Sequence, residues 1–174
     1  MNDLDIRQSL NYQTYIEHSK SLKYAGDENL NLFLSNTKNK NTSLQVGLHS
    51  STMLLYAVSI ELILKARGLY EEKEEIKMGN VKNYREFLKR WGGNFDGHNF
   101  FKIIDHYNLI ISEKHQKIFN ELISFTTWAG RFPFPKPENE TLQFENGNGQ
   151  RGKLNSRFEK EIELFILNQI IIMR

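Results

Sequence analysis

The feature that most limits the possible fold is the stretch from His49 to Tyr70, HSSTMLLYAVSIELILKARGLY. As a helix it would be apolar on nearly every side, and such a helix has to be covered by other elements. Its middle nevertheless contains Glu61 and Lys65, four residues apart. Glu placed four residues before Lys is the favourable order for an ion pair on a helix, and buried charges persist only when they are paired. We expect an ion pair that either fixes helix packing or belongs to a polar pocket or a dimer interface.

Capping patterns set the expected limits of this helix and of the helices before it. Thr42 to Gln45 matches a capping box, which predicts a long buried helix over about 43–70. Upstream, Gly26 predicts the end of a first helix, and Asp27 predicts the cap of a second, short one.

The C-terminal half predicts further short helices and one irregular segment. Helix starts are expected at Asn83, after Gly97, at Ser112 and at a capping box from Ser156 to Glu159. Residues 130–153 contain all three prolines of the chain and four of its 11 glycines, which favours extended backbone and turns over helix. We therefore expect one domain over residues 1–174, an all-α, antiparallel (up-and-down) helical bundle with an irregular arm at about 130–153.

Composition excludes several classes of function. The chain has no cysteine, so disulfides, thiolate metal sites and thiol catalysis are not available, in keeping with an expected cytoplasmic location. A net charge of +2 does not by itself predict nucleic-acid binding. The five histidines show no metal-ligand spacing and no cofactor motif is present, so we expect neither metal nor cofactor. No run approaches the roughly 20 apolar residues of a membrane span, so we expect no membrane partner.

Two single residues are candidates for ligand contact. His98 follows Gly97 at a predicted helix start, where it either caps the helix or faces a cleft in which exposed backbone amides receive an anion. Arg131 lies where a predicted helix gives way to the proline-rich segment. Its rigid guanidinium fork suits a phosphate or carboxylate ligand, and it would equally tie the arm to the end of the helix.

Three motifs in this order resemble a known family. They are SIELILKA around Glu61 and Lys65, GHNFFKIID from Gly97 onward, and WAGRFPFP around Arg131. They are similar to the ELxLKA helix, the Gly-His-Asx-Leu-like helix start and the Arg-Tyr-Pro-like ending of the HEPN superfamily. The resemblance covers roughly residues 44–135, together with the last helix by position. It implies a helical bundle that commonly dimerises, as in RNA-cleaving toxins, anti-phage systems and nucleotidyltransferase partners.

The resemblance also implies a set of site residues, because the polar positions that recur in the family would cluster in the folded bundle. We take as ligand-binding candidates Glu61, Lys65, His98, Asn99 and Arg131. Catalytic members use an Arg, four to six intervening residues and a His, paired across a dimer to cleave RNA. Here the nearest such pair, Arg90 and His98, has seven residues between its members, so the chain departs from that pattern.

The function expected from these observations is that of a non-catalytic HEPN-like domain. It would form a homodimer and bind RNA, a nucleotide or a protein partner in a toxin–antitoxin or anti-phage system. One alternative is a diverged metal-independent ribonuclease that uses Arg90 and His98, with the histidine for proton transfer and the arginine for charge stabilisation. Another is a purely structural dimerisation scaffold.

Overall fold

The structure, a computed structural model, describes residues 8–36, 41–91, 97–126 and 154–174. Over these ranges the regular elements are one 3-10 helix, η2, and seven α-helices, and no strand is present. Their bounds are η2 Gln8–Leu10, α1 Tyr12–Ser35, α2 Thr42–Glu71, α3 Lys73–Lys77, α4 Tyr84–Lys89, α5 Phe100–His106, α6 Glu113–Ser124 and α8 Ser156–Ile172. The expected all-α bundle around one long helix is confirmed. The predicted arm at about 130–153 lies outside the described residues.

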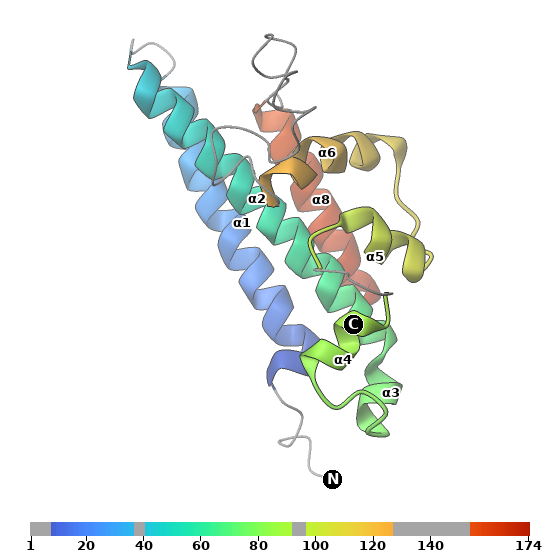
Figure 1. Cartoon of the computed structure of the whole chain (residues 1–174). Helices are drawn as coiled ribbons and strands as arrows, with labels where there is room; N and C mark the ends of the chain where they lie inside the picture. The colour runs from blue at the N-terminus through green and yellow to red at the C-terminus, as the bar shows by residue number, and fades with distance from the viewer. Residues whose placement is uncertain (1–7, 37–40, 92–96, 127–153) are drawn as a thin grey trace, which may run out of the picture.

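The two longest helices, α1 and α2, form an antiparallel hairpin along most of their length (Figure 1). They approach closely at Ser19 and Ser59, whose hydroxyls each donate to the other's carbonyl oxygen at 2.8 Å. Further along, a Cβ atom on Gly26 would lie 2.6 Å from the ring of Tyr56. The predicted helix end at Gly26 is therefore wrong, since α1 continues through it. The glycine lets Tyr56 of α2 pack against the backbone of α1.

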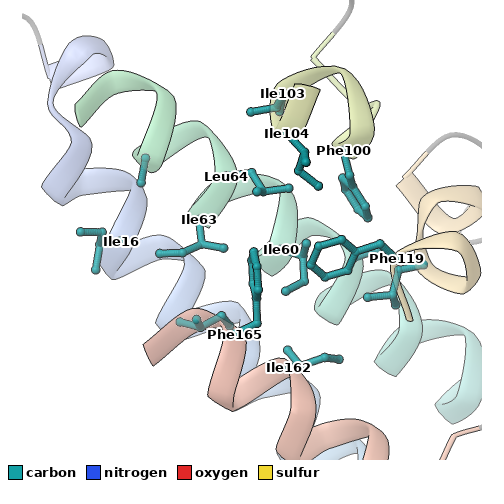
Figure 2. Packing of buried hydrophobic residues seen from close by; sticks show 14 of the residues in the cluster. Ile16, Ile60, Ile63, Leu64, Phe100, Ile103, Ile104, Phe119, Ile162 and Phe165 are labelled. Carbon is teal, nitrogen blue, oxygen red and sulfur yellow. The ribbon is translucent and has the colours of Figure 1, made fainter. Parts of the chain in front are cut away.

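The core surrounds the middle of α2. Figure 2 shows side chains of the other long helices and of α5 and α6 meeting around Ile60, Ile63 and Leu64 of α2. The surrounding residues are Ile16 of α1, Phe100, Ile103 and Ile104 of α5, Phe119 of α6, and Ile162 and Phe165 of α8. Helix α8 lies along α2 in the same direction, antiparallel to α1 (Figure 1). The expectation that this helix forms the centre of the bundle is confirmed.

Asparagine side chains cap the starts of several helices. Asn41 accepts from the amide of Leu44, and Asn155 accepts from the amide of Phe158, so both caps lie one residue before the threonine and serine of the predicted capping boxes. Asn83 is confirmed as the cap of α4. Ser112 is likewise confirmed as the cap of α6. An amide oxygen next to the first turn satisfies the same unpaired backbone N–H groups as a serine or threonine hydroxyl.

Helix α2 is long and apolar enough, by length and composition, to cross a membrane. Within the structure, 44% of its most apolar window is buried. The core helix of a soluble protein meets the same criteria, so this is weak evidence for a membrane span. Burial begins at Thr52 and includes both charged residues of its middle, whereas Leu44 in the first turn is 43% exposed. The start of α2 therefore packs less fully than its apolar sequence predicts.

Candidate functional site

Glu61 and Lys65 form an ion pair inside the bundle. The Lys65 ammonium lies 2.5 Å from Oε1 of Glu61, and each residue is only 6% exposed. Both charges are removed from water, so either one would be costly to keep buried without the other. The predicted buried i, i+4 pair is therefore present.

The second carboxylate oxygen of Glu61 binds His98, which comes from the segment just before α5. The distance from Nδ1 of His98 to Oε2 of Glu61 is 2.9 Å, and the histidine side chain is 40% exposed. An ionised carboxylate only accepts hydrogen bonds, so Nδ1 of His98 carries the proton in this contact. In the neutral ring the other nitrogen, Nε2, is then the acceptor. A buried carboxylate thus fixes the tautomer of a half-exposed imidazole.

Local backbone features place His98 at this position. Gly97 has a φ of +80°, a conformation that suits glycine, and a Cβ atom there would lie 3.1 Å from Cε and Nζ of Lys65. On the other side, the oxygen of Asn99 accepts from the amides of Phe101 and Lys102 and caps α5. The loop backbone therefore passes directly over the buried lysine before the helix begins.

Two tyrosines complete the surroundings of the ion pair. Tyr15 of α1 stacks on Tyr84 of α4, with ring centroids 5.9 Å apart. Burial, and secondly the nearby Glu61 carboxylate, raise the pKa of Tyr84 to about 12. Burial and then Tyr84 raise the pKa of Tyr15 above its ordinary value, although the charge of Lys65 opposes this. Both hydroxyls therefore stay protonated at neutral pH, and that of Tyr15 donates to the carbonyl oxygen of Ser9 at 3.0 Å.

Arg90, the arginine of the ribonuclease alternative, forms a different cluster. Its guanidinium is 2.9 Å from Oε2 of Glu72 and 3.3 Å from Oε2 of Glu75, two residues at the end of α2 and in α3. The hydroxyl of Tyr107 also reaches Glu72 at 3.4 Å and accepts from the indole of Trp91 at 2.8 Å. These contacts assign Arg90 to the packing of α3, α4 and the end of α5.

The candidate residues thus have different outcomes. Glu61, Lys65 and His98 come together, as the resemblance implied, whereas Arg131 lies outside the described residues. Asn99 adjoins them, but its side-chain oxygen is occupied as a helix cap. Sequence reasoning missed Tyr15 and Tyr84 because no spacing rule links residues of α1 and α4 to a charge on α2.

A second, half-buried ion cluster joins the three long helices. Lys23 of α1 contacts Asp27 at 2.8 Å and Glu159 of α8 at 3.1 Å, and the hydroxyl of Tyr56 donates to Asp27 at 2.9 Å. Burial, the largest effect, lowers the pKa of Lys23, but hydrogen bonds to the two carboxylates outweigh it and leave the pKa raised. Its sequence signal was present, because Lys23 and Asp27 are four residues apart, but Asp27 was interpreted as a helix cap.

The arrangement around His98 allows proton transfer or hydrogen bonding to a ligand at the surface. The charges of the buried residues next to it, Glu61 and Lys65, neutralise each other. In the part of the chain that the structure describes, no group of three or more His, Asp or Glu side chains could hold a metal ion. Comparison of the chain with protein-family models, with curated proteins and with solved structures found no match. The geometry of the site is therefore the main guide to function.

Proposed function

We propose that this chain is a HEPN-like helical domain that binds single-stranded RNA or a nucleotide through His98 without cleaving it. The observation that carries the proposal is the hydrogen bond between the half-exposed His98 and the buried Glu61. It presents a fixed imidazole at the surface as the polar contact for a ligand. Arg90 is engaged with Glu72 and Glu75, which favours binding over cleavage because the charge-stabilising arginine of the catalytic pattern is committed elsewhere.

The charges of the site suggest how such binding depends on salt. Glu61 and Lys65 neutralise each other, so this described pair adds no net positive charge to attract phosphates. Affinity that comes from phosphate contacts falls steeply with salt concentration, whereas affinity that comes from contacts to bases and sugars does not. Binding at this site should therefore weaken only slightly as salt is raised.

Fluorescence anisotropy with a labelled single-stranded RNA tests the proposal directly. We expect the affinity for the RNA to fall about tenfold or more in His98→Ala, because this variant loses one well-placed polar contact. His106→Ala is the matched control, because His106 is an exposed histidine at the end of α5. Equal losses in both variants, or no binding by the wild-type protein, would contradict the proposal. A protein partner in place of RNA would give no anisotropy change.

The second candidate function is a metal-independent ribonuclease. The observation that favours it is the same Glu61–His98 pair, since a carboxylate that orients a histidine is an arrangement used in general acid–base catalysis. Total RNA incubated with the purified protein in a chelating buffer distinguishes the two functions. RNA that stays intact supports the binding proposal, and cleavage that disappears in His98→Ala would replace it with the ribonuclease.

The expected homodimer and the toxin–antitoxin or anti-phage setting are part of the same proposal. Light scattering coupled to size exclusion gives the molar mass directly, and a mass of twice 20.5 kDa is expected. A monomer at micromolar concentration would contradict the dimer but not the His98 binding site.

A further inference from the structure

A pocket of about 260 Å³ opens where η2 folds back against the first turns of α1. It is lined by Gln8 and Ser9 of η2, Thr14, Tyr15 and His18 of α1, and Leu62 of α2. This volume lies just below the roughly 300–1,000 Å³ of pockets for drug-sized ligands, so the pocket suits a single ring system. None of its lining residues belongs to the Glu61–His98 pair, so it is a second candidate site.

Hydrogen bonds fix the walls of this pocket in advance. The hydroxyl of Thr14 donates to Oε1 of Gln8 at 2.9 Å, and the hydroxyl of Tyr15 donates to the carbonyl of Ser9 at 3.0 Å. Leu10 and Ile16, each at most 5% exposed, anchor η2 and α1 to the core on either side. A pocket that exists before the ligand arrives avoids part of the ordering cost of binding.

The lining of the pocket is mostly apolar, with a few polar groups at its edge. Leu62 and the ring of Tyr15 supply apolar and aromatic surface, and Tyr15 is itself held by its stack on Tyr84. On the rim, Oε1 of Gln8 is already used by Thr14, which leaves the Gln8 amide nitrogen as a donor. The Ser9 hydroxyl and the His18 imidazole add groups that donate or accept.

These properties select one class of ligand. Among the described residues that line the pocket there is no carboxylate and no Lys or Arg, so none of these side chains would pair with a phosphate, a carboxylate or a zwitterionic amino acid. A sugar would need more hydrogen-bond partners than three rim groups provide. A flat, neutral aromatic heterocycle fits the mostly apolar lining, and the few polar groups at the edge suit the donors and acceptors on its own edge.

We propose that the pocket between η2, α1 and Leu62 binds a nucleobase, stacked beside Tyr15 and hydrogen-bonded at its edge by Gln8, Ser9 or His18. The ligand is small and the pocket open, so the expected dissociation constant for a free nucleoside is on the order of 1 mM. The pocket does not depend on His98, so this proposal and the proposed function can fail separately.

Saturation-transfer NMR with adenosine, with inorganic phosphate and glucose as comparison probes, tests the proposal. We expect transfer to the base protons of adenosine and none to glucose. Phosphate should not displace adenosine. Absence of transfer at millimolar adenosine would overturn the proposal, as would equal transfer to glucose.

Two variants locate the binding. Leu62→Phe narrows the floor of the pocket and should weaken adenosine binding at least tenfold, whereas Leu167→Phe, at an α8 leucine that is 48% exposed, should leave it unchanged. If circular dichroism shows Leu62→Phe to be unfolded, His18→Trp replaces it, because His18 is exposed on the rim. Unchanged adenosine binding in the folded pocket variant would overturn the proposal.

His98→Ala separates this site from the proposed function. It should lower RNA binding while it changes adenosine affinity by less than twofold. A parallel loss of both would place the base at His98 and overturn the pocket proposal.

Discussion

The two ion clusters of this protein, one half-buried and one buried, have similar chemistry but different surroundings. In both, a lysine pairs with an acid four residues away on its own helix, Lys23 with Asp27 and Lys65 with Glu61. The first cluster is completed by two acids of α8, Glu159 at 3.1 Å and the half-exposed Glu163 at 3.7 Å from the Lys23 ammonium. The second is completed by His98, a half-exposed residue from a loop. The difference lies in the kind of residue that reaches solvent. In the first cluster it is an acid on a long helix, and in the second it is an imidazole oriented by a buried ion pair.

The largest expected effect is in the cluster around Glu61. Replacing Glu61 with Leu should lower the free energy of unfolding by about 3–5 kcal/mol, because it leaves the Lys65 ammonium buried without its partner. The double variant Glu61→Leu with Lys65→Met should recover most of that loss, since it removes both charges at similar volume. Urea denaturation of the two single variants and the double variant measures the coupling.

The same double variant distinguishes a binding site from a scaffold. If it is stably folded, RNA binding should be weakened, because His98 has lost the carboxylate that orients it. Unchanged RNA binding by the folded double variant would support the purely structural role of the pair.

Next in size is the effect of adding one methyl group beside the cluster of Lys23. Gly26→Ala should lower the free energy of unfolding by about 2 kcal/mol, because the new Cβ atom would lie 2.6 Å from the ring of Tyr56. That ring is held in place by the hydrogen bond from the Tyr56 hydroxyl to Asp27. Gly47→Ala is the matched control in α2, where nothing lies within 4 Å, and should raise stability by about 0.5–1 kcal/mol. Thermal denaturation that gives both variants the same sign of change would show that the contact with Tyr56 is not tight.

A smaller effect is expected when the cation of the Lys23 cluster is removed. Lys23→Met should lower the free energy of unfolding by about 1–2 kcal/mol, because Asp27 and Glu159 are about a quarter exposed and water compensates part of the loss. RNA affinity should not change. A loss of RNA binding at unchanged stability would mean that this cluster, too, belongs to a site.

The smallest effect concerns His115 of α6, which lies 3.9 Å from Glu161 and stacks on Phe119. Burial, the largest cause, lowers the pKa of His115 below its ordinary value of 6.5, and the opposing effect of the Glu161 carboxylate is smaller. The unfolded chain therefore takes up the proton first, and this residue's contribution to stability is present above pH 6.5 and lost as pH falls through the lowered pKa. His115→Phe should reduce the slope of stability against pH below 6.5, measured by urea denaturation. An unchanged slope would contradict the lowered pKa.

Sequence reasoning identified the parts of the site that lie on one helix. The period of an α-helix places residues i and i+4 on one face, so the contact between Glu61 and Lys65 followed from their spacing. The same rule applied to Lys23 and Asp27, but the glycine between them was interpreted as a helix end. Glycine commonly ends a helix by adopting the left-handed conformation. Gly26 does not adopt it and lies within α1, where the ring of Tyr56 packs against it.

The sequence by itself determined the helical class, the central position of α2 and the presence of paired charges inside it. These follow from hydrophobic periodicity and from the cost of burying a charge alone, which are local properties of the chain. Only the tertiary structure decided that Glu61 binds His98, 37 residues away. It also decided that Arg90 forms ion pairs with Glu72 and Glu75, and that two tyrosines lie next to the Glu61–Lys65 pair. Such contacts depend on how separate helices pack, because side chains far apart in sequence meet only through the fold.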